Sequence, residues 1–92
     1  MEPVRFEWHR AKAEENLRKH GVSFDEAVTV FYDPLSATFN DDEHSADETR
    51  LITVGYSARG RLLVAAHTER GASVRIISAR RATVRERKRH ET

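Results

Sequence analysis

Apolar and charged residues alternate over residues 4–8, and the spacing then changes to one typical of a helix. Residues 10–20 are rich in Ala, Leu, Glu, Lys and Arg, and Gly21 follows where helices often end in a left-handed residue. We therefore expect a short half-buried strand and then a helix. Helical spacing places Ala13 and Leu17 on the side of that helix that would face a core.

A second helix is predicted after Gly21 by a capping signal and an apolar stripe. Ser23 and Glu26 form an S-x-x-E capping box, and Val22 can act as a hydrophobic staple. The stripe recurs at intervals of three and four residues, at Phe24, Ala27, Val28 and Phe31. Asp33-Pro34 ends the helix, because the residue before a proline disfavours helical geometry.

The second half of the chain has the alternation and short connections of an antiparallel sheet. Residues 35–40 are compatible with a short strand, and residues 41–49 form a polar, acidic loop without periodicity. Three further strands are predicted, over residues 50–57, 61–68 and 73–80. Connections this short join antiparallel neighbours. Thr83 and Glu86 then form a second capping box, which opens a short basic C-terminal helix.

These elements predict one α+β domain over residues 1–92, ordered β-α-α-β-β-β-β with a short C-terminal helix. The sheet is expected to be mainly antiparallel, with both N-terminal helices packed on one face, since each helix has an apolar side to bury. The other face would then be free and would display alternate residues of the basic strands.

Composition adds a strong division of charge between the two halves of the chain. The net charge is +1, but residues 1–49 carry five Lys/Arg against twelve Asp/Glu, whereas residues 50–92 carry eleven against three. The basic half suits a polyanion, although the two halves could also pair through surface salt bridges. There is no cysteine and no apolar run long enough for a membrane span, so we expect a soluble cytoplasmic protein without membrane contact.

The densest candidate chemistry lies in the segment from Arg75 to Arg81. Arginine binds phosphate through two parallel hydrogen bonds, and three arginines on one short strand suggest an anion site. Strict alternation places Arg75 on one strand face with Ile77 and Ala79, and Arg80 on the other. The two could share a cleft only if the strand twists or bulges.

Many short motifs, in order, resemble the BrnT family of toxins, and the likeness covers nearly the whole chain. They are Phe6-Glu7-Trp8, Lys12, Asn16-Leu17, Lys19 to Phe24, Glu26-Ala27, Asp33-Pro34, His44-Ser45, Glu48-Thr49-Arg50, Gly55, Arg75 to Arg80, Thr83 and Arg85-Glu86. His9 departs from the pattern, because such toxins commonly carry Asp after the tryptophan. Asp is a much better helix N-cap than His, so this difference concerns the first helix rather than the chemistry.

The resemblance implies the toxin of a type II toxin–antitoxin pair, with a fold similar to RelE-type toxins. Such a toxin cleaves RNA as a metal-independent endonuclease, inhibits translation and needs no cofactor. Its implied partner is a BrnA-like antitoxin that binds operator DNA, so the toxin would reach DNA only through a hetero-oligomer dimerised by the antitoxin.

Ribonuclease chemistry requires a base for the 2′-hydroxyl, an acid for the leaving oxygen and cations for the phosphate. The cations we predict are Arg50, Arg75 and Arg80, although each could instead be an ordinary surface arginine. His20 is the predicted acid or base, because histidine titrates near neutrality. A favourable contact with the helix dipole is the alternative role of His20. Glu48 could be a base or could orient Arg50.

Other basic residues are assigned to RNA binding rather than to catalysis. These are Lys19, Arg61, His67 and Arg81. His67 could reach the same face as Arg75, or could be an ordinary strand residue. Trp8 could stack on a base, but its spacing favours core packing. The histidines show no metal-ligand spacing, and the acidic loop at 41–48 lacks the pattern of a calcium site, so no metal is expected.

Two classes of function remain open on the residues alone. One is an RNA endonuclease toxin, and the other is a non-catalytic RNA-binding or protein-adaptor domain. Both would need the same arginines.

Overall fold

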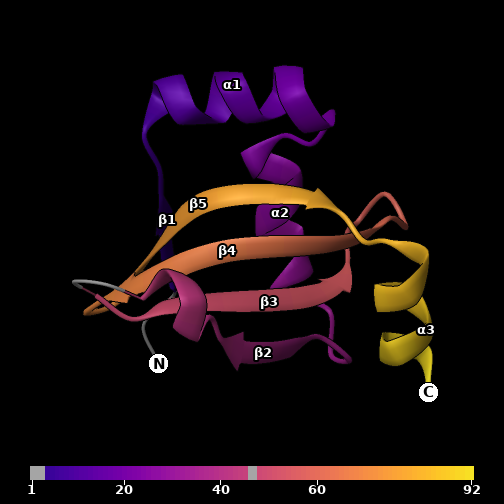
Figure 1. The fold of residues 1–92 in the computed structure, drawn as a ribbon. Helices are drawn as coiled ribbons and strands as arrows, with labels where there is room; N and C mark the ends of the chain where they lie inside the picture. Colours follow the sequence, from indigo (N-terminus) through magenta and orange to yellow (C-terminus); the bar gives the residue numbers. More distant parts are fainter. Residues whose placement is uncertain (1–3, 46–47) are drawn as a thin grey trace.

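The computed structural model describes residues 4–45 and 48–92, which form one sheet with helices packed against it (Figure 1). The elements are β1 (Arg5–Glu7), α1 (Arg10–His20), α2 (Phe24–Val30), β2 (Ala37–Asn40), the 3-10 helix η1 (Asp42–His44), β3 (Arg50–Tyr56), β4 (Leu62–Arg70), β5 (Ser73–Arg81) and α3 (Val84–Glu91). This order confirms the predicted α+β arrangement. None of the helices in the described part of the chain has the length and apolar character needed to span a membrane.

The sheet has the order β1-β5-β4-β3-β2. Strands β2 to β5 pair antiparallel with their neighbours, as predicted from the short connections. β1 instead pairs in parallel with β5, at the far edge of the sheet. Almost the whole chain separates these two strands, so no local pattern could have placed β1 there.

A β-bulge in β5 overturns the predicted alternation of its side chains. The register shifts between Ala66 and His67 of β4, which leaves Ile77 as an extra residue between the pairs Ala66–Ser78 and His67–Ile76. Because of this extra residue, side chains on the two sides of the bulge no longer follow one continuous alternation between the faces of the sheet. Arg75 and Arg80 therefore lie on the same face, not on opposite faces as strict alternation predicted.

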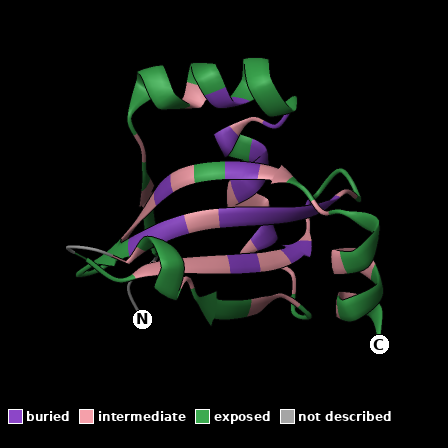
Figure 2. Cartoon of the chain, viewed as in Figure 1, coloured by how far each residue is buried: buried purple, intermediate pink, exposed green. Residues whose placement is uncertain are grey.

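The core lies between α2 and the covered face of the central strands. Its buried cluster consists of Val22, Ala27, Val30, Leu63, Ala65 and Ala79. Figure 2 shows buried positions concentrated along β4 and α2, while α1 is mostly exposed. Of the predicted α2 stripe, Phe24 and Ala27 are buried, but Val28 and Phe31 are half-buried and Val30 takes a core position instead.

Helix α1 is held to the sheet mainly by a polar residue. The buried Asn16 amide donates to the carbonyl oxygens of Val22 and Ala79 at 2.9 and 2.8 Å, and accepts from the Ala79 N–H at 3.0 Å. The predicted burial of Leu17 is wrong, since this residue is 52% exposed. Gly21 ends the helix at φ 67°, as predicted.

Two apolar residues of β3 point away from the helices. Ile52 and Val54 line the face opposite to the core, whereas Thr53 and Gly55 face α2. The free face of the sheet is therefore polar at one end and apolar at the other, and this surface carries the candidate site. Trp8, in contrast, packs edge-to-face on Phe24 at 5.8 Å between ring centroids, which supports its predicted packing role.

Candidate active site

A cavity of about 260 Å³ on the free face brings together side chains from three strands and the β2–β3 connection. It is lined by Asp41, His44, Arg50, Ile52, Val64, Ala66, Ser78 and Arg80. Two of the predicted phosphate-binding residues, Arg50 and Arg80, thus meet in one concave surface. We call this cavity the polar pocket.

The β2–β3 connection is folded back onto the backbone of Arg50. The Asp41 N–H donates to the Arg50 carbonyl oxygen at 2.8 Å, and the Arg50 N–H donates to Ser45 Oγ at 2.9 Å. Ser45 Oγ also donates to the Asp41 carbonyl oxygen at 2.7 Å. These bonds fix the turn containing His44 beside the arginine, so the acidic segment contributes to the pocket wall.

His44 forms a pair with Asp41 within this turn. Its Nδ1 lies 3.0 and 3.1 Å from the two carboxylate oxygens of Asp41, whose side chain is 12% exposed. A carboxylate bonded to Nδ1 fixes the ring orientation and favours the tautomer with a proton on Nδ1. Nε2 is then left to exchange a proton with a ligand. This pair was not among the predicted site residues, although the D-x-x-H spacing of Asp41 and His44 is a sequence signal for it.

Arg80 is held by a forked ion pair with α3. Its two terminal nitrogens donate to the Glu86 carboxylate at 2.8 and 2.9 Å, and Glu86 also accepts from the Thr83 N–H in the predicted capping box. The hydrogen bonds that Arg80 donates lower the pKa of Glu86 to about 2, and the same bonds raise the pKa of Arg80. The guanidinium carries five N–H donors, so this fork orients Arg80 without using all of them.

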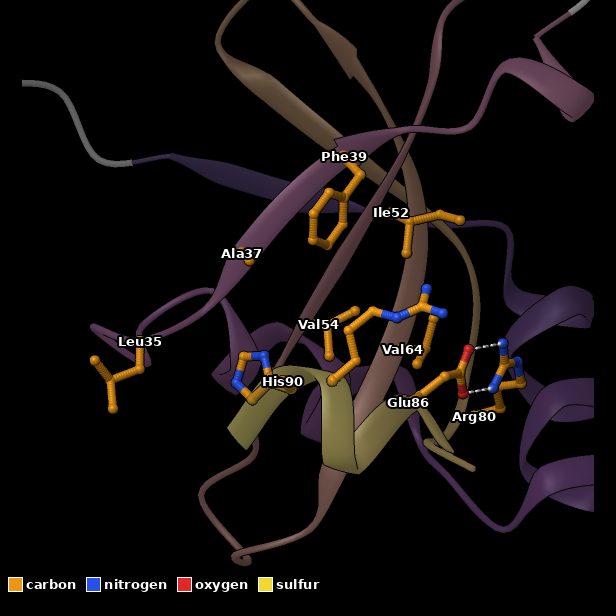
Figure 3. A pocket seen from close by; sticks show the side chains of 10 residues that line it. Leu35, Ala37, Phe39, Ile52, Val54, Val64, Arg80, Glu86 and His90 are labelled. Carbon is orange, nitrogen blue, oxygen red and sulfur yellow. Dashed lines mark hydrogen bonds and ion pairs between the residues drawn. The ribbon is translucent and has the colours of Figure 1, made fainter. Parts of the chain in front are cut away.

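A second cavity of about 450 Å³ adjoins the polar pocket and shares Ile52, Val64 and Arg80 with it. Figure 3 shows side chains of β2 and β3 facing those of α3 across this space. Its remaining lining residues are Leu35, Ala37, Phe39, Val54, Glu86, Arg89 and His90. We call it the apolar pocket; together the two pockets form one groove along the free face.

Arg75 lies on the same face but lines neither pocket. It pairs with Thr68 of β4, which in turn pairs with Arg50 of β3, so the two arginines flank one threonine. Its Nε is 3.9 Å from a carboxylate oxygen of Glu7. Arg75 thus extends the basic surface beyond the groove.

Glu48 is also outside the groove. Its carboxylate accepts from Arg70 at 3.1 Å and is half exposed, so its contact is with Arg70 rather than with Arg50.

The other predicted residues lie on the helix side of the sheet. Lys19 and His20 are exposed in the last turn of α1, and Arg81 is exposed at the end of β5, beyond the buried Ala79. Arg61 is paired with Glu26 of α2, and its hydrogen bond lowers the pKa of that buried carboxyl. The structure therefore does not bring these residues to Arg50 and Arg80.

His67 occupies the interior rather than the arginine face, so the expectation that it could reach the face of Arg75 is wrong. It is 1% exposed, its Nε2 lies 2.8 Å from Thr53 Oγ1, and its ring packs edge-to-face on Phe31 at 4.8 Å. Burial lowers the pKa of His67 to about 4, so the ring is neutral near pH 7. The bulge opposite His67 is what separates it from Arg75.

One group in the turn offers metal-ligand atoms, which the sequence motifs did not predict. Ligand atoms of Asp41, Glu43 and His44 lie within 4.8 Å of one another. The same Asp41–His44 contact that would form part of such a group already serves as a hydrogen bond.

The fold and the groove define a small α+β domain that presents arginines and a histidine–aspartate pair on an open sheet face. The family model described as "Ribonuclease toxin, BrnT, of type II toxin-antitoxin system" matches residues 8–86, and the chain belongs to this family. An antitoxin protein is therefore its expected partner.

Among solved structures, the Brucella abortus ribonuclease toxin BrnT, determined at 1.1 Å resolution, has a similar fold. The TM-score is 0.68 at 19% sequence identity, and the match covers 88% of this chain and 99% of that one. No curated protein sequence matches the chain.

Proposed function

We propose that the chain is a metal-independent RNA endonuclease toxin whose catalytic groups lie in the polar pocket. The observation that supports this most is the convergence of Arg50, Arg80 and the His44–Asp41 pair on one cavity. The two guanidiniums supply cationic donors for a phosphate, and the histidine supplies a proton-transfer group.

The proposed reaction uses the nucleophile that RNA itself carries. The 2′-oxygen loses its proton and bonds to the adjacent phosphorus while the bond from phosphorus to the 5′-oxygen breaks and that oxygen gains a proton. The products are a 2′,3′-cyclic phosphate and a 5′-hydroxyl. His44 carries one of the two proton transfers through Nε2, and Arg50 and Arg80 stabilise the charge that develops on the phosphorane oxygens.

The two arginines differ in how far their charge is already compensated. Arg80 shares its charge with Glu86, whereas Arg50 is fixed through its backbone and lines the pocket wall. Arg50 is therefore the main phosphate cation in this proposal, and Arg80 is an oriented second donor. His20 has no part in the step, because it lies on the helix side of the sheet.

The partner in the proposal is a BrnA-like antitoxin that covers the arginine face and thereby excludes RNA. Operator DNA is contacted only through the antitoxin, and cleavage of cytoplasmic RNA inhibits translation. A complex that leaves the polar pocket open to solvent would contradict this mode of neutralisation.

The test is cleavage of a defined single-stranded RNA by purified toxin in excess EDTA. We expect fragments ending in 2′,3′-cyclic phosphate, a loss of at least about 100-fold in kcat for Arg50→Ala, and little change for the matched Arg81→Ala on the opposite face. Intact RNA at high protein concentration would favour the alternative, a non-catalytic RNA-binding or adaptor domain.

A further inference from the structure

The apolar pocket exposes more hydrophobic surface than the fold requires. Leu35 is 76% exposed and Phe39 is 56% exposed, and both line this pocket together with the half-buried Ile52 and Val54. Exposed apolar surface rimmed by polar residues is a feature of ligand-binding grooves. The pocket opens directly into the proposed catalytic groove, since Ile52, Val64 and Arg80 line both.

We propose that the apolar pocket binds the nucleobase of a nucleotide next to the cleaved phosphate, with the ring of Phe39 as the stacking platform. This inference rests on the proposed function, and it assigns to the groove a base subsite beside the phosphate subsite. Bases in single-stranded RNA are commonly held by stacking on aromatic rings or on arginine planes.

Strand register places Phe39 at a distance from the phosphate-binding Arg50 that suits a single nucleotide. Phe39 pairs directly with Ile52, and Arg50 lies two residues earlier on β3, on the same face. Diagonal neighbours of this kind are about 7–8 Å apart across an antiparallel pair. One nucleotide can therefore place its phosphate at Arg50 and its base at Phe39.

The opposite wall of the pocket favours a polyanion over an apolar peptide. It is formed by α3, which contributes Arg89 and His90, and Figure 3 shows His90 projecting from this helix toward the pocket. The two acidic residues of α3 are already engaged, Glu86 by Arg80 and Glu91 by the hydroxyl of Tyr56. The guanidinium of Arg89 and the ring of Phe39 line the same pocket and provide two stacking surfaces for a base.

Stacking of this kind tolerates every base, because each has a π-face. The pocket is therefore expected to hold the nucleotide in place and to give at most a modest preference among bases.

The test compares two RNA oligonucleotides that differ only at the nucleotide beside the mapped cleavage bond, which is either normal or abasic. Wild-type protein should cleave the abasic RNA about 5- to 100-fold less efficiently in kcat/KM. Phe39→Ala should show the same loss on normal RNA and should equal wild type on abasic RNA, while Phe39→Trp should keep the discrimination.

Tyr32→Ala is the matched control, because Tyr32 is a 71% exposed aromatic residue packed near Phe6 on the helix side. It should cleave both oligonucleotides as wild type does. The base subsite is refuted if the ratio of kcat/KM for normal RNA to that for abasic RNA is the same in Phe39→Ala as in wild type, whether or not both values fall. Refutation also follows if Phe39→Ala leaves cleavage unchanged and abolishes only antitoxin binding, because the pocket would then be a protein site.

Failure of the proposed function can be separated from failure of this inference. If wild type cleaves no RNA and no bond can be mapped, the affinities for two fluorescently labelled single-stranded RNAs, one normal and one abasic at its central nucleotides, give an independent measure. Tighter binding of the normal RNA that disappears in Phe39→Ala supports the base subsite, whereas equal binding of both RNAs overturns it.

Discussion

Arg75 and Arg80 lie on the same face of β5 although five positions separate them. Their β4 partners, Thr68 and Val64, are four residues apart in a regular strand and therefore share a face, and the extra residue Ile77 makes up the difference. The bulge thus gathers Arg50, Arg75 and Arg80 on the free side of the sheet. Without it, Arg75 would point toward the helices, where a guanidinium would have to be desolvated.

The first prediction is that Arg75 and Arg50 have different kinetic roles, because Arg50 lines the groove and Arg75 lies outside it. Arg75→Ala should raise KM several-fold, reduce the slope of log KM against log salt by about 1, and leave kcat nearly unchanged, because Arg75 lines neither pocket. Steady-state cleavage at several salt concentrations measures this. A loss in kcat as large as that of Arg50→Ala would show that Arg75 contacts the reacting phosphate.

The second prediction follows from the burial of His67. Its pKa falls from 6.5 to about 4 on folding, so between these values the unfolded chain binds a proton that the folded chain does not. Above pH 6.5, His67 does not lower the free energy of unfolding. As the pH falls toward 4, protonation of His67 in the unfolded chain lowers this free energy, by at most about 3 kcal/mol. His67→Gln should flatten the profile.

Urea unfolding between pH 6.5 and about 5 measures this effect with little interference from carboxylates. Glu86, for example, contributes stability above its ordinary pKa of 4.5 and loses it only as the pH falls toward its folded value of about 2. An unchanged slope in His67→Gln would mean that the ring is protonated in the fold.

The third prediction concerns Asn16, whose amide makes three hydrogen bonds to the backbone of Val22 and Ala79. Asn16→Ala should cost about 2–4 kcal/mol, because it leaves buried backbone groups without partners. Leu17→Ala on the next, half-exposed position should cost less than about 1 kcal/mol. Urea midpoints measure both, and equal costs would show that α1 is held by Leu17 rather than by the Asn16 bonds.

Local patterns were enough to predict the order of the strands and α-helices, the antiparallel pairing of β2 to β5 and the starts of α1, α2 and α3, although not the 3-10 helix η1. Strand alternation and short turns are properties of neighbouring residues, so they survive folding unchanged. The capping box at Thr83 has both of its hydrogen bonds. At Ser23 only the side-chain oxygen caps the helix, because the Glu26 carboxylate turns inward to Arg61 and Ser57. That exchange depends on Ser57 and Arg61 in the β3–β4 connection, which no pattern near residue 23 contains.

The candidate site was only partly predictable, for a similar reason. Arg50 and Arg80 could be selected by residue type, but their meeting depends on the bulge at Ile77, which has no glycine or other sequence signal. His20 was selected because it ends the first helix beside Lys19, whereas His44 lies in an acidic loop without periodicity and was not considered as acid or base. The backbone bonds from Arg50 to residues 41–45 give that loop its position.

The most direct test of the proposed site is the ratio of two single-turnover cleavage rates in EDTA, those of His44→Ala and His20→Ala. If the polar pocket is catalytic, His44→Ala slows cleavage by about 100-fold or more while RNA affinity is kept, and His20→Ala stays within a few-fold of wild type. A large loss for His20→Ala together with a wild-type rate for His44→Ala would place the chemistry on the helix side and contradict the site proposed for this toxin.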